Sequence, residues 1–264
     1  MDYAVQFGHP IIDHCQDESL VDKGQVNEGV ASTRLGMLGW PAAGEEIHIA
    51  RDIELARLTG AHLHVQHLTS GHGIELVRAG KAAGVNVTCE VTPHHMFLTE
   101  DAIGGDYNTA LKVNPPLRTA ADAQAIIDAV VDGTVDCIVT DHAPHADFEK
   151  AREFEEAPFG MTGIETSLGA VLTNLVNPGT ISVSRMVELM CVNPRAIIGI
   201  EPVKIEAGSV ANLTAFDMDA EWDVTEDYFQ SKATNCGFTG AHFKGKATDV
   251  FVKGAAKMRD GELL

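Results

Sequence analysis

Apolar segments that alternate with amphipathic segments along the first 202 residues constrain the fold more than any other feature of this sequence. The apolar segments have the length and residue types of β-strands, and the amphipathic ones repeat their apolar residues at helical spacing. Strands are predicted at residues 11–14, 61–67, 85–91 and 135–140, and helices at 45–59, 73–83, 120–133, 182–191 and 194–199. Such alternation produces βαβ units and a parallel sheet. We therefore predict an α/β fold for residues 1–202.

The ends of several helices are also marked in the sequence. Gly60 and Gly133 follow helical segments at positions where a left-handed cap ends a helix, and Thr119 with Asp122 has the spacing of an N-cap pair. Residues 1–8 resemble the last turns of a helix, so the chain is expected to begin within a βα unit. After residue 202 the helical pattern stops, and residues 203–264 are predicted to form a small β-sandwich segment of short strands.

Composition excludes several classes of function. The 264 residues carry a formal net charge of −19, which disfavours binding to nucleic acid because phosphate groups are repelled. Five scattered cysteines without C-x-x-C spacing indicate a reducing compartment rather than a disulfide framework. No signal peptide is evident, and no apolar run of about 18 residues could span a membrane. We therefore expect a cytoplasmic protein that associates with neither nucleic acid nor membrane.

The four predicted strands all end in imidazole or carboxylate side chains. In parallel α/β folds the loops after the strands form the mouth of the site. Neutral imidazoles and carboxylates are the usual ligands of catalytic zinc, and a neighbouring carboxylate can carry the proton of metal-bound water. His62 and His64, in the middle of a strand, are interpreted as structural, whereas His94 and His95 fit either role. The strand-end residues are His14, His67, His94, His95, Asp141, His142 and His145.

These residues lie within motifs that resemble the bacterial class I dihydroorotases of the amidohydrolase superfamily. "TDHAPH" at 140–145 together with "NPPLR" at 114–118 is the most specific combination, and the resemblance extends over essentially the whole chain. It implies that residues 1–202 form the C-terminal half of a (β/α)8 barrel. It also implies a zinc-dependent cyclic amide hydrolase that interconverts L-dihydroorotate and N-carbamoyl-L-aspartate in pyrimidine biosynthesis. Hydantoinase-like or allantoinase-like activity is the alternative within the same superfamily.

The resemblance also assigns roles to single residues. His14 and His67 match ligands of the second of two zinc ions, whereas Asp141 matches a ligand of the first zinc ion that also serves as general base and acid. The positions that match substrate-binding residues are Asn114, His145, Phe159 and Gly160, with His145 expected to pair with the substrate carboxylate. His142 is interpreted as a structural residue or a support for its neighbours.

Part of the family's ligand set has no counterpart in this sequence. The first-strand H-x-H pair with its Arg, a later Asn and the bridging Asp are missing, because "HLH" at 62–64 lies in the wrong strand. We therefore expect at most a partial zinc site and little activity from the chain alone. The chain is expected to be a truncated enzyme, a half that pairs with a complementing N-terminal half or with itself as a homo-oligomer, or a non-catalytic scaffold, for instance for aspartate carbamoyltransferase.

Overall fold

A computed structural model describes all 264 residues and contains the expected parallel sheet. The sheet has four strands in the order β1 (Ile11–Asp13), β4 (Leu63–Val65), β5 (Val87–Val91) and β6 (Cys137–Ile138). All three pairings are parallel, and neighbouring strands follow one another along the chain apart from the small β2–β3 pair. This consecutive order is the one found in βα barrels. The prediction of an α/β fold with a parallel sheet is confirmed.

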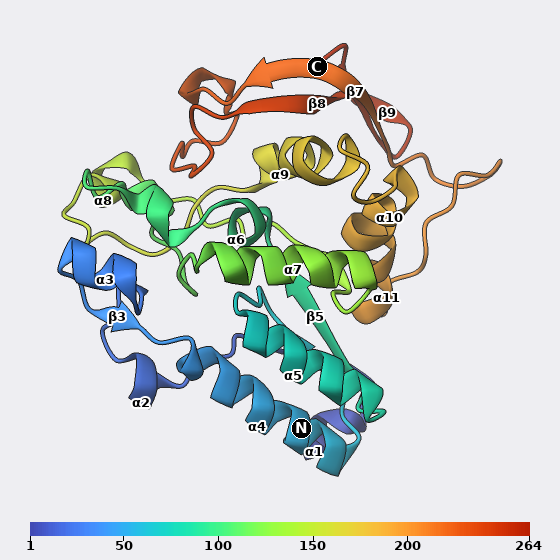
Figure 1. Cartoon of the computed structure of the whole chain (residues 1–264). Coiled ribbons are helices and arrows are strands. Elements are labelled where there is room, and N and C mark those ends of the chain that lie inside the picture. Colours follow the sequence, from blue (N-terminus) through green and yellow to red (C-terminus); the bar gives the residue numbers. More distant parts are fainter.

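Three long helices cover one side of this sheet (Figure 1). They are α4 (Ala43–Thr59), α5 (Gly71–Ala82) and α7 (Ala120–Asp132), which pack side by side. Gly60 and Gly133 take the left-handed conformation after α4 and α7, and Thr119 and Asp122 form the expected capping box. The helices and the sheet share a core of 26 buried residues, including Leu63, Val65 and Val87 of the strands.

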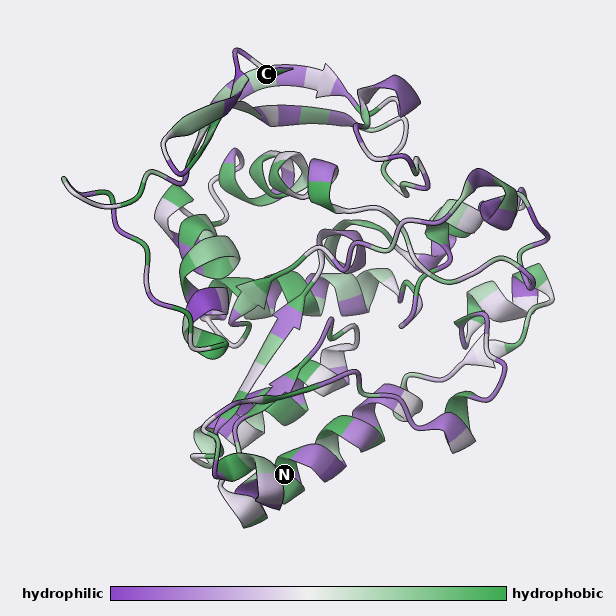
Figure 2. Cartoon of the chain, turned by 180° about the vertical axis from the view of Figure 1, so that it is seen from behind, coloured by the Kyte–Doolittle hydropathy of each residue, from purple (hydrophilic) through white to green (hydrophobic).

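The opposite side of the sheet is polar. Strand register places Ile12 beside His64, and His64 beside Thr88, on one face. His64 Nε2 donates to Glu90 Oε2 at 3.0 Å, and its Nδ1 is 2.7 Å from Thr88 Oγ1. Seen from behind, the strands carry hydrophilic as well as hydrophobic residues (Figure 2). A parallel sheet is ordinarily apolar on both faces, so this polar face points to a function.

The C-terminal part of the chain forms a second, antiparallel sheet, which lies above α9 in Figure 1. Its strand order is β10 (Glu262–Leu263), β9 (Ala255–Arg259), β8 (His242–Val252) and β7 (Leu213–Asp223). β8 packs against α9 (Ile164–Val171) and the π-helical turn that continues it, Leu172–Val176. Strands β7 and β8 have 11 residues each, which is longer than the short strands expected from the sequence. A domain boundary near residue 202 and a β-sandwich in this segment stay predictions.

The remaining elements are short. The predicted helices at 182–191 and 194–199 are a continuous helical stretch in which a π-helical turn separates two α-helical ones. No helix is both long enough and apolar enough to cross a membrane. The short elements are α1 (Asp2–Val5), α2 (Glu18–Val21), β2 (Val26–Asn27), α3 (Val30–Leu35), β3 (Gly39–Trp40), α6 (Pro93–Phe97), α8 (Asp147–Lys150), α10 (Val183–Val187), α11 (Asn193–Ile197), the 3₁₀ turns Glu100–Ile103, Thr109–Leu111 and Glu226–Tyr228, and the π turn Glu188–Val192.

Candidate metal and substrate site

Two of the predicted metal ligands meet at the ends of neighbouring strands. His14 follows β1, His67 lies just after β4, and His14 Nδ1 is 2.8 Å from His67 Nε2. The other nitrogen of His14, Nε2, is 2.9 Å from Gln16 Oε1 and therefore donates its hydrogen to this amide oxygen. That bond leaves the lone pair of Nδ1 facing His67. A second hydrogen bond of this kind is what orients metal-binding imidazoles.

The backbone is strained at two of the predicted ligands. His67 has φ 27° and Asp141 has φ 45°, which is the left-handed region that residues other than glycine rarely adopt. Because β4 already ends at Val65, this turn determines the direction of the His67 side chain, and strand alternation does not extend to it. Strain of this type costs about 1–3 kcal/mol and is concentrated at functional sites.

Asp141 lies near the histidine pair without joining it directly. Asp141 as a whole residue is exposed at the end of β6. Desolvation of its carboxyl group nevertheless raises the pKa of that group, and the charge of His14 opposes this rise. Glu90, on the polar face of the sheet, raises the pKa of Asp141 further. The ligand atoms of His14, His67 and Asp141 do not all lie within 4.8 Å of one another. The structure therefore brings His14 and His67 together and leaves Asp141 at their side.

Asn114 is connected to the histidine pair through a residue that the sequence analysis missed. Its Nδ2 donates to Gln16 Oε1 at 2.9 Å, so that this one oxygen accepts bonds from both Asn114 and His14. Asn114 Oδ1 is buried and has no partner in the protein, which leaves it free to accept a hydrogen bond from a ligand. Gln16 follows His14 by two residues in an extended segment, and this spacing was the available signal that both side chains share a face.

His145, Phe159 and Gly160 form a second group of contacts. His145 Nε2 donates to the carbonyl oxygen of Phe159 at 2.8 Å, which leaves Nδ1 to face outward at 3.9 Å from Glu149. Gly160 has φ 125°, and a Cβ there would lie 2.5 Å from the Cβ of Ala143. Only glycine therefore fits at residue 160.

Two further residues, also missed by the sequence analysis, hold this group in place. Asn235, from the C-terminal part of the chain, accepts from the backbone N–H of His145 and donates to the carbonyl of Gly160. Lys112 is fully buried, donates to three carbonyl oxygens at residues 154–157 and lies over the Phe159 ring. Burial lowers the pKa of Lys112 to about 8.

The other strand-end histidines differ in their surroundings. His142 Nδ1 accepts hydrogen bonds from the backbone N–H groups that begin α9, which agrees with a structural role. His95 bonds to Thr92 Oγ1 and to the carbonyl oxygen of Pro115, and so supports the loop that carries Asn114. His94 is buried next to His67, its Nε2 has no partner, and burial lowers its pKa to about 3.

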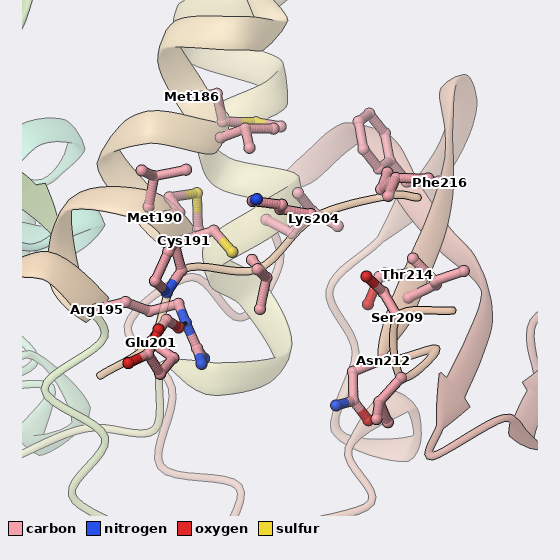
Figure 3. A pocket seen from close by; sticks show the side chains of 18 residues that line it. Met186, Met190, Cys191, Arg195, Glu201, Lys204, Ser209, Asn212, Thr214 and Phe216 are labelled. Atoms are coloured by element: carbon pink, nitrogen blue, oxygen red, sulfur yellow. Dashed lines mark hydrogen bonds between the residues drawn. The ribbon is translucent and has the colours of Figure 1, made fainter. Parts of the chain in front are cut away.

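A separate cavity contains none of the predicted site residues. It has a volume of about 790 Å³ and is lined mainly by apolar side chains from the helical stretch 183–197, the segment that follows it and β7. Met186, Met190 and Phe216 are among the labelled residues of this cavity (Figure 3). It offers no cluster of acid–base groups, so the strand ends remain the candidate site.

Comparison with known proteins shows what this chain is similar to. The family described as dihydro-orotase-like matches residues 1–72. Proteins named dihydroorotase from Acetivibrio thermocellus and Ruminiclostridium cellulolyticum are 43% and 44% identical over all of this chain. These matches show that the chain resembles the dihydroorotases over its whole length. It spans 62% and 61% of the length of these two relatives.

Solved structures of hydantoinases share the fold of this chain. An L-hydantoinase (dihydropyrimidinase) from Arthrobacter aurescens is 28% identical, with a TM-score of 0.90 over all of this chain and 60% of the hydantoinase. A D-hydantoinase from a Thermus species is 24% identical, with a TM-score of 0.85, and shows the shared fold. The dihydroorotases are thus closer to this chain in sequence than these hydantoinases are.

Proposed function

We propose that this chain carries part of the active site of a zinc-dependent dihydroorotase, which interconverts L-dihydroorotate and N-carbamoyl-L-aspartate. The observation that carries the proposal is the meeting of His14 Nδ1 and His67 Nε2 at 2.8 Å. Two zinc-bound imidazole nitrogens are about 3.4 Å apart at Zn–N distances of about 2.1 Å, so a small separation of the rings would admit the ion. The donor pair therefore fits the zinc that the lineage implies.

Each predicted residue has a role that its contacts allow. A bound zinc would supply hydroxide near neutral pH. Asp141, whose pKa is raised, is suited to take a proton from the nucleophile and return it to the leaving nitrogen. The unpartnered Oδ1 of Asn114 would accept a hydrogen bond from the ring N–H of the substrate. His145 must be protonated at Nδ1 to bind the substrate carboxylate, because its Nε2–H is already donated to Phe159.

The ligand set within this chain is incomplete for two zinc ions, so we propose that other ligands come from a second polypeptide segment. A complementing N-terminal half and a second copy of this chain are both compatible with the open sheet, in which Ile12 of the edge strand is 46% exposed. Aspartate carbamoyltransferase as a partner, and a cytoplasmic location, stay predictions.

The test mixes the zinc-loaded chain with the segment of the Acetivibrio thermocellus dihydroorotase that this chain does not match. We expect no hydrolysis of L-dihydroorotate by the chain alone, hydrolysis by the mixture, and loss of at least two orders of magnitude in rate with Asp141→Asn. His72→Asn, which changes an exposed histidine near His67, is the matched control and should retain the rate.

One result would contradict this proposal, and another would decide between the two sources of the missing ligands. If the two segments co-purify but do not hydrolyse dihydroorotate, the assigned reaction is wrong. If the chain alone is active and Asp141→Asn abolishes that activity, the missing ligands come from a second copy of this chain. A hydantoin should be a poor substrate in the same assay, because it offers no carboxylate for His145; rapid hydantoin hydrolysis would favour the alternative activity.

A further inference from the structure

A second cluster of metal-ligating side chains lies on the opposite face of β1 from His14. Asp13 and Cys15 alternate with His14 along the strand and its extension, and therefore point toward α4. His48 and Asp52 of α4, which are one helical turn apart, face them. One ligand atom from each of these four residues lies within 4.8 Å of all the others. None of the four was assigned a metal role from the sequence.

Three distances within this cluster are close to those of a tetrahedral site, and the others are below 4.8 Å. His48 Nε2 is 3.0 Å from Asp13 Oδ2 and 3.6 Å from Asp52 Oδ2, and Cys15 Sγ is 3.5 Å from Asp13 Oδ2. Ligand atoms around a tetrahedral zinc ion are about 3.3–3.8 Å apart, given metal–ligand distances of about 2.0–2.3 Å. The donors are therefore already spaced nearly as an ion would require.

Two side chains of the cluster are buried, and the other two are partly buried. Cys15 is 2% exposed, and the side chain of Asp52 is 5% exposed. Burial, followed by the hydrogen bond with Asp13, raises the pKa of Asp52, because two carboxylates beside one imidazole are costly in a partly desolvated place. Such groups are usually paired or bound to a metal.

Arg51 supplies the present counter-charge. Its Nε donates to Asp52 Oδ1 at 2.9 Å, and its guanidinium also contacts His48 Nε2. The side chain of Arg51 is 54% exposed, so that it can swing into solvent and release both partners. Arg51 thus occupies the outer side of the cluster, where it would compete with a cation.

We propose that Asp13, Cys15, His48 and Asp52 form a binding site for a divalent transition-metal ion of the zinc class, separate from the His14–His67 site. One imidazole, one thiolate and two carboxylates suit zinc or cobalt, whereas magnesium and calcium prefer oxygen ligands alone. The ion would join β1 to α4 and so hold the strand that presents His14 on its other face. Its role is structural, because its four protein ligands leave no open position.

Cobalt substitution tests this site independently of enzyme activity. A thiolate bound to Co²⁺ gives an intense charge-transfer absorption in the near ultraviolet, and the His14–His67 site contains no sulfur. We expect the wild-type chain to show this band on titration with Co²⁺, and Cys15→Ser to abolish it. His48→Gln should weaken Co²⁺ binding by at least about ten-fold. Cys191→Ser is the matched control, because Cys191 is the one exposed cysteine.

Two further variants separate the proposal from misfolding and from the proposed function. Arg51→Ala should tighten Co²⁺ binding several-fold, a gain that a damaged fold would not produce. His67→Asn should leave the thiolate band intact even if it removes a second, sulfur-free ion. The proposal is overturned if the band is absent from the wild-type chain, if it persists in Cys15→Ser, or if Arg51→Ala fails to increase the affinity.

Discussion

The two sides of the parallel sheet differ in the chemistry of their side chains and in what they contribute to the stability of the fold. The side that faces α4, α5 and α7 carries Leu63, Val65 and Val87, which are buried in the main core. The other side carries His64, Thr88 and Glu90, which bond to one another, and its upper rim holds the histidine pair. Apolar burial on the first side stabilises the fold, whereas the second side places polar groups at the cost of desolvating them. Acid should therefore lower the free energy of unfolding mainly through groups on the polar side. Shortening a side chain should lower it mainly on the apolar side.

A fall in pH should produce the largest change in the free energy of unfolding. In the metal-free chain, burial lowers the pKa of His67 to about 4 and that of His94 to about 3, from 6.5, with His95 also well below 6.5. The unfolded chain therefore binds more protons than the folded chain between these pH values. The free energy of unfolding contributed by these groups should be fully present above pH 6.5 and should fall as the pH drops toward 3. Urea unfolding at a series of pH values measures this fall.

A variant isolates the histidine contribution from that of the carboxylates. His94→Gln should make the decline in unfolding free energy shallower, because one buried imidazole no longer takes up a proton. Carboxylates titrate equally in both proteins, so their contribution cancels in the difference between the two curves. Parallel curves would mean that His94 is not held neutral by burial.

Truncation of the apolar side should come next in size. Leu63 is 0% exposed, so Leu63→Ala should lower the free energy of unfolding by about 2–5 kcal/mol. Ile12→Ala, on the polar side of the edge strand, should cost about 1 kcal/mol or less, because Ile12 is 46% exposed. Chemical denaturation of both variants measures the contrast. Equal costs would indicate that another molecule covers Ile12.

Removal of a polar-side hydrogen-bond network should have a smaller effect than the loss of Leu63. His64→Leu leaves Glu90 and Thr88 without their shared partner, and should lower the free energy of unfolding by about 1–3 kcal/mol. His62→Leu removes a single bond to Thr88 from a half-buried position and should cost less. The comparison uses the same denaturation assay. A stabilised His64→Leu chain would show that this network opposes folding.

The sequence was sufficient for those parts of the fold that depend on local pattern. Strands β1, β4, β5 and β6, the long helices, and the caps at Thr119 and Gly133 lie where periodicity and capping residues predicted them. Local signals worked there because each element has its own hydrophobic period and end residues. The helix from Ile164 to Val176 was missed, although it packs beneath the antiparallel sheet.

The strand-end residues of the candidate site could be predicted from the sequence, whereas the hydrogen bonds that connect them to other residues could not. His14 and His67 meet as the parallel strands require. Three contacts became visible only with the fold: Gln16 with Asn114, Asn235 with His145, and Lys112 with the carbonyl oxygen of Phe154. The two residues of each contact are 42 to 98 positions apart in the sequence. The cluster around His48 was equally hidden, since neither of its two halves is unusual when read alone.

Alternation at the end of β1 also limits how this segment can change in evolution. Asp13 and Cys15 belong to one cluster, while His14 and Gln16 belong to the other. Substitutions can alter these clusters one at a time. An insertion or deletion of a single residue here would exchange them, sending a thiol toward the candidate active site and an imidazole into the helix interface. We therefore expect this stretch to tolerate changes of residue far better than changes of length.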